Sequence, residues 1–386
     1  MKAKQKSRSV RQETPILQYA DTRKSADQFY SGGFQVPDPF ISIHLEGEKI
    51  GFFSRLEIGR AGRESGFDTI LSLEEWQERA RNGKKGAVPG PSEVIRLFCR
   101  ERGIQTVRVG SDFPVGLAFA LTSGGLAVDV ARGMLFPQRE FKTDAEAAAI
   151  AEGNRCSAAG IRAAERVLQS SRIVGEFIVY QNRRLTSERL RLEVEKACLE
   201  RGAVSEDTIV AGGVQACDPH CRGSGLLRAN ELIIVDVFPR VTATGFYGDM
   251  TRTFLKGRAS EAQKKLVATV QEGQRIALEQ IRSGVSGASI HRKVSAWFEA
   301  QGYRTTETSD GPVGFFHGTG HGLGLEVHEP PRISAVGPRL RRNQVVTVEP
   351  GLYYPGIGGC RIEDVVRVGT KGPEMLSKLH YRWQIR

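Results

Sequence analysis

The first 141 residues alternate apolar and polar positions over short stretches, which predicts a small mixed α/β domain. Apolar side chains alternate over residues 41–45, the glycine-containing stretch EGEK follows, and the apolar run IGFF comes next, so a β-hairpin is predicted here. A helix is predicted over residues 92–102, and it is expected to end there because Gly103 follows. A strand is predicted over residues 106–109. This half of the sequence contains no cluster of catalytic residue types.

From Thr143 onward the pattern changes to longer helical periods. Thr143 and Glu146 have the spacing of a capping box, so a long alanine-rich helix is predicted to begin there. A second helix is predicted over residues 187–201, and an apolar strand is predicted over residues 232–235. This strand leads directly into an acidic residue.

Two aspartates, Asp236 and Asp249, bound the segment that follows this strand, and the segment is poor in charge. A buried carboxylate needs a cation, hydrogen-bond donors or a metal ion, because an unpaired buried charge is strongly unfavourable. Taken alone, the pair has two explanations. The aspartates are either strand-end residues satisfied by Arg240, Arg252 and turn amides, or ligands of a metal ion.

A capping box, two helices and an apolar strand occur again in the same order later in the chain. The expected segments are the box of Ser260 and Gln263, a helix to about residue 282, a second helix over residues 287–301 and a strand over residues 345–348. Glu349 ends this strand and Glu363 follows 14 residues later, much as Asp249 follows Asp236 by 13. The repeat predicts an internal duplication whose halves face each other across a pseudo-twofold axis, with four carboxylates meeting in the middle.

The pattern of helices and strands predicts an α/β (α+β) fold, and composition places the chain among soluble globular proteins. Its 386 residues, 40% of them hydrophobic, are enough for two domains with real cores. The net charge of +11 is partly gathered in a basic tail, residues 1–12, which is predicted to be disordered. The remaining basic residues form no aromatic-interleaved stripe, so no specific nucleic-acid partner is expected. No apolar run approaches the ~18 residues of a membrane span and no signal peptide is recognisable, so a cytoplasmic protein without a membrane partner is expected.

The six cysteines are scattered, which is typical of reduced thiols rather than of a disulfide framework. Cys217, His220 and Cys221 lie close together in ACDPHC. A structural zinc site needs a second pair of ligands at finger-like spacing, and the sequence offers none. The sequence therefore leaves the role of these two thiols open.

A glycine-rich segment, FFHGTGHGLGLEVHEPPR, holds three of the seven histidines: His317, His321 and His328. Glycine allows close backbone approach and positive φ, so histidines placed among glycines indicate a shaped active-site segment. A flexible surface loop with incidental histidines is the alternative.

Taken together, four carboxylates and a histidine form a candidate metal centre. Gathered in one place, Asp236, Asp249, Glu349 and Glu363 would repel one another strongly unless cations neutralised them, and two divalent ions supply four positive charges. A mostly oxygen ligand set with one imidazole suits Mn, Fe, Co or Zn. Two such ions, about 3.5–4 Å apart, can hold a bridging hydroxide, which indicates hydrolytic chemistry.

Four ordered motifs resemble one known family. DMTRTF at residues 249–254, HGTGHGLGLEVHE at 317–329, TVEPGLYYPGIGG at 347–359 and RIEDVV at 361–366 are similar to the metallopeptidases that include aminopeptidase P, prolidase and methionine aminopeptidase. The resemblance implies a pita-bread catalytic domain over residues 142–386, preceded by a creatinase-like α/β domain over residues 1–141. It also implies two divalent metal ions, manganese first among Mn, Co, Zn and Fe. The implied ligands are Asp236, Asp249, His321, Glu349 and Glu363, with Asp249 and Glu363 shared or bridging.

The resemblance also implies roles for residues around the ions. His328 would contact the substrate carbonyl, and His220 would approach the scissile amide. Glu349 would bind metal and carry the proton from the attacking water to the leaving nitrogen, and Arg361 would orient carboxylates. His317 would lie near the leaving-group pocket as a substrate-binding residue, with a purely structural role as the alternative.

The sequence departs from the family pattern between the two aspartates. The step from Asp236 to Asp249 is longer than in most members, and Phe238-Pro239 occupies the place of a glycine. A longer hairpin between the two strands would keep the ligands intact, and it would alter the neighbouring wall of the substrate pocket.

The implied activity is that of an Xaa-Pro aminopeptidase or Xaa-Pro dipeptidase, which hydrolyses the bond between an N-terminal residue and a following proline. The extra N-terminal domain favours this type over methionine aminopeptidase, and a homodimer is expected by the same resemblance. The alternatives are methionine aminopeptidase activity, a catalytically silent binding module and a metal-free hydrolase like creatinase. The complete ligand set argues against the last two.

Overall fold

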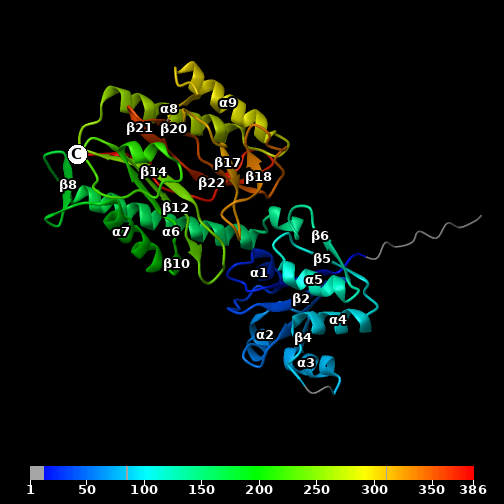
Figure 1. The fold of residues 1–386 in the computed structure, drawn as a ribbon. Helices are drawn as coiled ribbons and strands as arrows, with labels where there is room; N and C mark the ends of the chain where they lie inside the picture. The colour runs from blue at the N-terminus through cyan, green and yellow to red at the C-terminus, as the bar shows by residue number, and fades with distance from the viewer. Residues whose placement is uncertain (1–12, 84–85, 310) are drawn as a thin grey trace, which may run out of the picture. The chain divides into compact units, whose positions relative to one another are not determined.

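The computed structural model describes residues 13–83, 86–309 and 311–386, so the predicted basic tail lies outside the described residues. Contacts divide the chain into two compact units, residues 1–137 and residues 138–386. Figure 1 traces both units along the chain from blue to red. None of the described helices is both long and apolar enough to span a bilayer.

The first unit is built on a six-stranded sheet with the order β4-β3-β2-β1-β5-β6. Its strands are β1 (Ile16–Ala20), β2 (Phe40–Leu45), β3 (Glu48–Phe53), β4 (Thr69–Ser72), β5 (Thr106–Val109) and β6 (Ala127–Val130). Its helices are α1 (Ala26–Gly32), α2 (Ile58–Glu64), α3 (Leu73–Arg81), α4 (Pro91–Glu101) and α5 (Val115–Ser123). The apolar faces of strands and helices close one core around Ile43, Phe52 and Phe98.

The predicted elements of this unit are confirmed. The hairpin is β2 paired antiparallel with β3, and it turns at Glu46 and Gly47, whose φ angles of 52° and 89° give the tight left-handed turn that glycine favours. The predicted helix over residues 92–102 is α4, and the predicted strand over residues 106–109 is β5. The identity of this unit as a creatinase-like domain stays a prediction.

The first half of the second unit is built on a four-stranded sheet with the order β11-β12-β14-β24. These strands are β11 (Ile209–Gly212), β12 (Leu232–Val237), β14 (Met250–Lys256) and β24 (Gln384–Ile385), and the covering helices are α6 (Asp144–Gln169) and α7 (Ser187–Leu199). Smaller pairings are β7 (Arg172–Val174), β8 (Phe177–Tyr180) and β9 (Arg183–Arg184), and β10 (Ala203–Val204) with β13 (Arg240–Val241). The predicted capping box of Thr143 and Glu146 is confirmed at the start of α6.

The second half repeats this arrangement with a five-stranded sheet, order β18-β17-β19-β22-β23. Its strands are β17 (Gly320–Gly322), β18 (Glu329–Ile333), β19 (Val345–Val348), β22 (Asp364–Val368) and β23 (Pro373–Met375), and its helices are α8 (Glu261–Gln280) and α9 (Gly287–Ala300). Two further hairpins are β15 (Thr306–Thr308) with β16 (Gly311–Val313), and β20 (Gly351–Tyr354) with β21 (Gly358–Arg361). The predicted capping box of Ser260 and Gln263 is confirmed at the start of α8.

The two halves correspond in both order and pairing. Each half has two helices followed by an antiparallel strand pair, β12 with β14 and β19 with β22. In Figure 1 the strands β12, β14, β17 and β22 lie between α8 and α9 on one side and α6 and α7 on the other. The predicted duplicated α/β architecture is therefore confirmed, and it brings the strand ends that carry the acids to the middle of the unit.

The connection from β12 to β14 is a long hairpin. β12 pairs antiparallel with β14 in a register that sets Asp236 opposite Thr251. Within the connection, the short strand β13 pairs with β10. Asp249 comes at the end of this connection, directly before β14.

The backbone of helix α6 packs directly against the backbone of this connection. A Cβ atom added at Gly153 would lie 2.4 Å from the backbone nitrogen of Gly248, and one added at Gly248 would lie 2.0 Å from the carbonyl carbon of Gly153. Only a pair of glycines allows this approach. It fixes the turn that leads into Asp249 against the helix.

We expect the substitution Gly153→Ala to destabilise the protein by about 1–3 kcal/mol, because overpacking at a backbone contact cannot be relieved by moving a side chain. Gly62→Ala in the exposed face of α2 is the control, because a Cβ there meets nothing within 4 Å. Relative to wild type, the control should be neutral or stabilised by up to about 1 kcal/mol. Urea unfolding of both variants checks this, and an unchanged midpoint for Gly153→Ala would contradict it.

Candidate metal centre

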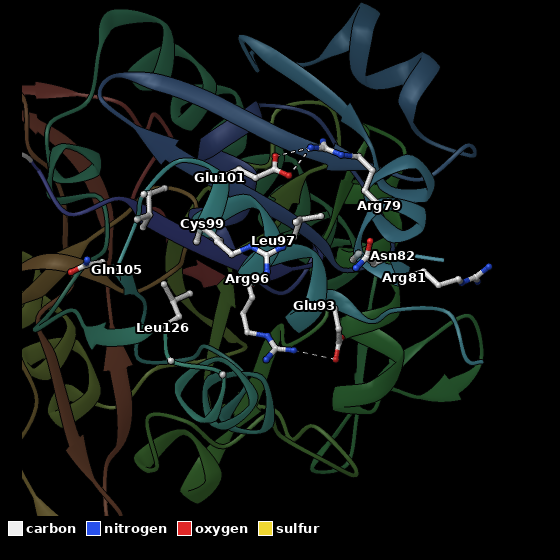
Figure 2. Close-up of a pocket in the computed structure, with 16 residues that line it drawn as sticks. Arg79, Arg81, Asn82, Glu93, Arg96, Leu97, Cys99, Glu101, Gln105 and Leu126 are labelled. Carbon is white, nitrogen blue, oxygen red and sulfur yellow. Dashed lines mark hydrogen bonds and ion pairs between the residues drawn. The ribbon is translucent and has the colours of Figure 1, made fainter. Parts of the chain in front are cut away.

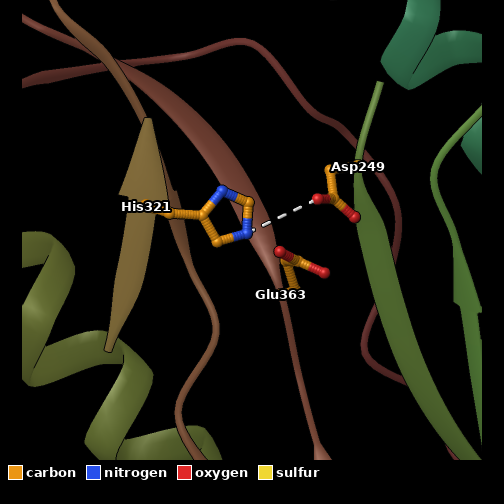
Figure 3. Close-up of side chains that lie close together, drawn as sticks. All are labelled: Asp249, His321 and Glu363. Carbon is orange, nitrogen blue, oxygen red and sulfur yellow. Dashed lines mark ion pairs between the residues drawn. The ribbon is translucent and has the colours of Figure 1, made fainter. Parts of the chain in front are cut away.

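All five predicted metal ligands line one cavity of about 810 Å³ in the second unit. Asp249, His321 and Glu363 each offer a ligand atom, and these atoms lie within 4.8 Å of one another. Figure 3 shows the three side chains pointing toward a common centre from three different segments of the unit. Long-range folding, not local sequence, thus brings them together.

The other two predicted ligands adjoin this group. Nε2 of His321 lies 3.2 Å from Oε1 of Glu349 and 3.8 Å from Oδ2 of Asp249. Asp236 accepts a hydrogen bond from Nη2 of Arg361 at 2.7 Å on its Oδ2 atom. Its buried Oδ1 atom has no hydrogen-bond partner among the described residues.

The electrostatics of the cluster call for cations. Burial raises the pKa of Asp249 well above its usual value, and the charges of Asp236 and Glu349 add to the effect. Burial likewise raises the pKa of Glu363, reinforced by Asp249 and Glu349. The protein alone therefore cannot keep all these carboxylates ionised. Together with the unsatisfied oxygen of Asp236, this donor set fits divalent ions.

Glu349 and His321 form a closely coupled pair within the cluster. Burial alone would raise the pKa of Glu349, but its hydrogen bond with His321 and the charge of that ring lower it. Burial alone would lower the pKa of His321, but the same hydrogen bond and charge raise it. The pair thus favours a protonated ring beside an ionised carboxylate, in the same cavity as the Arg361 guanidinium.

Two hydrogen-bonding residues that the sequence patterns did not single out hold the acids in place. Oδ1 of Asn154 on α6 accepts from the backbone N–H of Asp249 at 2.9 Å, and its amide nitrogen donates to the carbonyl of Leu376 at 3.2 Å. The hydroxyl of Thr251 donates to Oε2 of Glu363 at 2.8 Å. A lone asparagine in an alanine-rich helix and a threonine two residues after Asp249 were the available signals.

A buried chain of hydrogen bonds connects Asp236 to His317. Arg361 donates to Asp236 and, through Nη1, to the hydroxyl of Tyr353 at 2.9 Å. That hydroxyl lies 2.9 Å from Nε2 of His317, whose Nδ1 lies 2.7 Å from the carbonyl of Gly318. Because only an N–H can face a carbonyl, Nδ1 donates and Nε2 accepts from Tyr353. Burial lowers the pKa of His317 to about 4, so the ring is neutral.

This geometry bears on the two roles considered for His317. Both of its ring nitrogens are engaged within the protein, which favours the structural role over direct substrate hydrogen bonding. The predicted orienting role of Arg361 agrees with its bond to Asp236. Tyr353, fully buried between the two, was not identified from the sequence.

His328 and His220, the two predicted substrate-contacting histidines, line the same cavity. The His328 ring lies edge to face on the His321 ring, with centroids 4.4 Å apart. Burial lowers the pKa of His328 to about 4, with smaller contributions from His321 and Arg332. A neutral His328 keeps one N–H for an acceptor. His220 is exposed, and its backbone N–H donates to Asp218.

The remaining lining of the cavity is mostly apolar. Phe238, from the long hairpin, shares the wall with Phe316 and Val327. Asp218, Ser334 and Arg332 are the polar exceptions, and Arg332 is the cation among them. It is exposed, pairs with His321 across β17 and β18, and forms no ion pair within the described ranges. The sequence patterns did not single out this cation.

A larger cavity, of about 940 Å³, lies in the first unit and has a different character. Figure 2 shows ion pairs between residues of its lining, Arg79 with Glu101 and Arg96 with Glu93. Its lining contains no histidine and no group of carboxylates free of arginine. We therefore assign the chemistry to the cavity of the second unit.

Buried carboxylates and one imidazole at the junction of two duplicated α/β halves define the centre of a metal-dependent hydrolase. Residues 148–370, more than half of the chain, match the sequence profile of Metallopeptidase family M24. The chain belongs to this family.

Relatives and solved structures agree with this assignment. The chain is 35% identical over 177 residues to an Xaa-Pro dipeptidase of Pyrococcus horikoshii, covering 45% of this chain and 47% of that protein. It is 33% identical over 174 residues to an Xaa-Pro dipeptidase of Pyrococcus furiosus, with 45% and 47% covered. The matched segments thus span about half the length of these curated relatives.

The fold is similar over nearly the whole chain to two solved structures. An X-Pro aminopeptidase from Thermotoga maritima superposes with a TM-score of 0.79 and 24% identity, covering 96% of this chain and 97% of that one. The prolidase from Pyrococcus horikoshii gives a TM-score of 0.76 and 23% identity, covering 96% and 95%. The predicted pita-bread fold is confirmed.

We expect metal binding to the stripped protein to release protons. The raised pKa values of Asp249 and Glu363 keep protons on the metal-free site, so divalent ions must displace them and affinity must rise with pH. Because these raised pKa values mean that the folded protein binds more protons than the unfolded chain, the metal-free protein loses stability as pH rises from the ordinary carboxyl range through the raised pKa values. Calorimetric titration with Mn²⁺ in buffers of different ionisation enthalpy measures the release.

The variant Asp249→Asn should release fewer protons than wild type, while Asp218→Asn, at the exposed rim, should release as many. Identical heats in all buffers for the wild-type protein would show that the site is already ionised before the metal binds.

Proposed function

We propose that this protein is a dinuclear-metal exopeptidase that hydrolyses the bond between an N-terminal residue and a following proline. The observation that carries the proposal is the complete five-residue ligand set gathered in one cavity beside His328, in a chain of the M24 family. The similar proteins described above include an Xaa-Pro dipeptidase and an X-Pro aminopeptidase, which supports the same activity here.

In this proposal, Asp236, Asp249, His321, Glu349 and Glu363 hold two divalent ions, with Asp249 and Glu363 shared. When bound, such ions supply an activated water as nucleophile and polarise the scissile carbonyl. Manganese is the first ion to test, because the ligands are mostly carboxylate oxygens. A homodimer in the cytoplasm remains the expected setting.

Side chains of the protein then carry out the proton transfer, the stabilisation of the carbonyl oxygen and the orientation of the ligands. Glu349 accepts the proton of the attacking water and passes it to the leaving nitrogen. The neutral ring of His328 donates a hydrogen bond to the carbonyl oxygen as charge develops there. Arg361 keeps Asp236 oriented through its 2.7 Å bond, and exposed His220 lies at the mouth of the cavity. The apolar wall of Phe238, Phe316 and Val327 suits a proline ring.

Arg332 indicates how the protein selects substrates by length. It lines the cavity as a cation without an ion-pair partner in the described part of the chain, while Arg361 is committed to Asp236 and Tyr353. A free carboxylate is the complement of such a cation. This supports a preference for substrates whose C-terminus follows the proline directly, that is, for dipeptides.

We expect the protein reconstituted with Mn²⁺ to hydrolyse Xaa-Pro or Xaa-Pro-Yaa peptides, measured by release of the N-terminal residue. Replacing the proton carrier in Glu349→Gln should lower kcat by at least about 100-fold. Release of methionine from Met-Ala-Ser alone would transfer the assignment to methionine aminopeptidase activity. A purified protein with no bound ion and no chelator-sensitive hydrolysis would support a silent binding module.

We expect Arg332→Gln to raise KM for Xaa-Pro dipeptides by about 10- to 100-fold, because a charge-assisted hydrogen bond is lost. The same variant should leave KM for Xaa-Pro amides unchanged, since these lack the carboxylate. Arg339→Gln is the matched control, because Arg339 donates to the carbonyl of Gly284 and does not line the cavity. Equal effects of Arg332→Gln on acid and amide would refute carboxylate recognition.

A further inference from the structure

A buried ionic cluster lies directly beside His328. Glu329 is the first residue of β18, and its side chain is only 1% exposed. Nη2 of Arg139 donates to its Oε1 atom at 2.5 Å, and Nζ of Lys142 donates to its Oε2 atom at 2.8 Å. The side chains of Arg139 and Lys142 are 4% and 2% exposed. Such a cluster is stable only with all its partners present.

The carboxylate of Glu329 also closes the loop that carries His328. The backbone N–H groups of Leu325 and Glu326 donate to Oε1 at 3.1 and 3.2 Å. Glu329 itself pairs with Gly322 across the two strands, one residue after the ligand His321. The carboxylate therefore ties the start of the loop to its end, with His328 held between them.

Neighbouring backbone reinforces this closure. The carbonyl of Gly324 accepts from the N–H of Tyr247, in the long hairpin that ends at Asp249. A Cβ atom at Gly324 would lie 2.5 Å from Oε2 of Glu329, so only glycine allows the carboxylate to approach here. The loop has little freedom while Glu329 is ionised and in place.

Both cations come from outside the segment that matches the family. Arg139 and Lys142 precede residue 148, where the match begins, and belong to the stretch that opens the second unit. Arg139 also donates to the carboxylate of Glu326, a side chain that is 57% exposed, at 2.9 Å. The buried charge near His328 is thus neutralised by residues that lie outside the matched segment.

We propose that Glu329, held by Arg139 and Lys142, is a positioning residue that fixes the His328 ring against the metal centre for its hydrogen bond to the substrate carbonyl. The proposal rests on the proposed function for the role of His328. A cluster that served stability alone would lower the amount of folded enzyme and leave the turnover of the folded fraction intact. The two possibilities differ in kinetics.

The test is a double-substitution cycle with Xaa-Pro substrate, using proteins matched for metal content and assayed well below their unfolding temperatures. Glu329→Gln should lower kcat about 10- to 100-fold, with KM changed less than about threefold. In a His328→Ala background the same change should cost less than about threefold, because Glu329 acts through that ring. Glu326→Gln is the matched control, since it is the exposed acid of the same cluster, and its kcat should stay within about twofold of wild type.

A second pair of variants tests the proposal if Glu329→Gln folds poorly. Lys142→Met should lower kcat in the same way, and Lys142→Arg, which keeps the charge, should retain most of it. An unchanged kcat in Lys142→Met, or an equal loss from Glu329→Gln with and without His328, would overturn the proposal.

A readout without substrate separates this inference from the proposed function. In protein labelled at the histidine rings, the NMR signal that disappears in His328→Ala should shift in Glu329→Gln and stay in place in Glu326→Gln. If the wild type cleaves no Xaa-Pro peptide, the proposed function fails. A shifted His328 signal would still support the positioning role, and an unshifted signal would overturn it.

Discussion

Mutual repulsion among four clustered carboxylates, three of them buried, is the constraint on which the second unit depends. Burial raises the pKa of Asp249 and Glu363, and the charges of Asp236 and Glu349 raise both pKa values further. Three contacts offset part of this repulsion: Arg361 donates to Asp236, His321 contacts Glu349, and Thr251 donates to Glu363. One oxygen of Asp236 still has no hydrogen-bond partner among the described residues. The negative charge that these partners do not compensate is the kind of charge that divalent ions neutralise.

Duplication explains how a single chain can concentrate so much charge. Each half contributes an antiparallel strand pair whose covering helices form a separate apolar core, around Val235 in one half and Val346 in the other. The acids lie at or directly beside the ends of these strands. Stability therefore comes from the two cores, and the charged seam between them is left available for chemistry.

Much of this could be predicted from sequence because the determining signals are local. The capping boxes at Thr143 and Ser260 lie within one helical turn of the residues they bond, and hairpin alternation lies within a few positions. The ligand set followed from repeat spacing and family resemblance. Asn154, by contrast, bonds Asp249 across 95 residues, and nothing near it in the sequence indicates that partner. The same holds for Glu329 and its cations, separated by 187 or more positions.

His317 shows a different limit. Its residue type and its place among glycines fit substrate contact, but the tautomer that decides its role depends on Gly318 and Tyr353, which only the folded backbone brings to the ring. A residue type indicates which chemistry is available. The partners of both nitrogens decide which part of it is used.

The C-terminal segment around Leu376 to Tyr381 is tied to the metal centre through its backbone. Asn154 donates to the carbonyl of Leu376, and Arg252 donates to the carbonyls of Leu379 and His380 while also bonding the carbonyl of Glu363. These bonds use main-chain oxygens, and the side chains of Ser377 and Tyr381 add hydrogen bonds to Asp364, next to Glu363. Loss or nicking of this segment, which contributes no ligand of its own, would therefore reach Asp249 and Glu363 together.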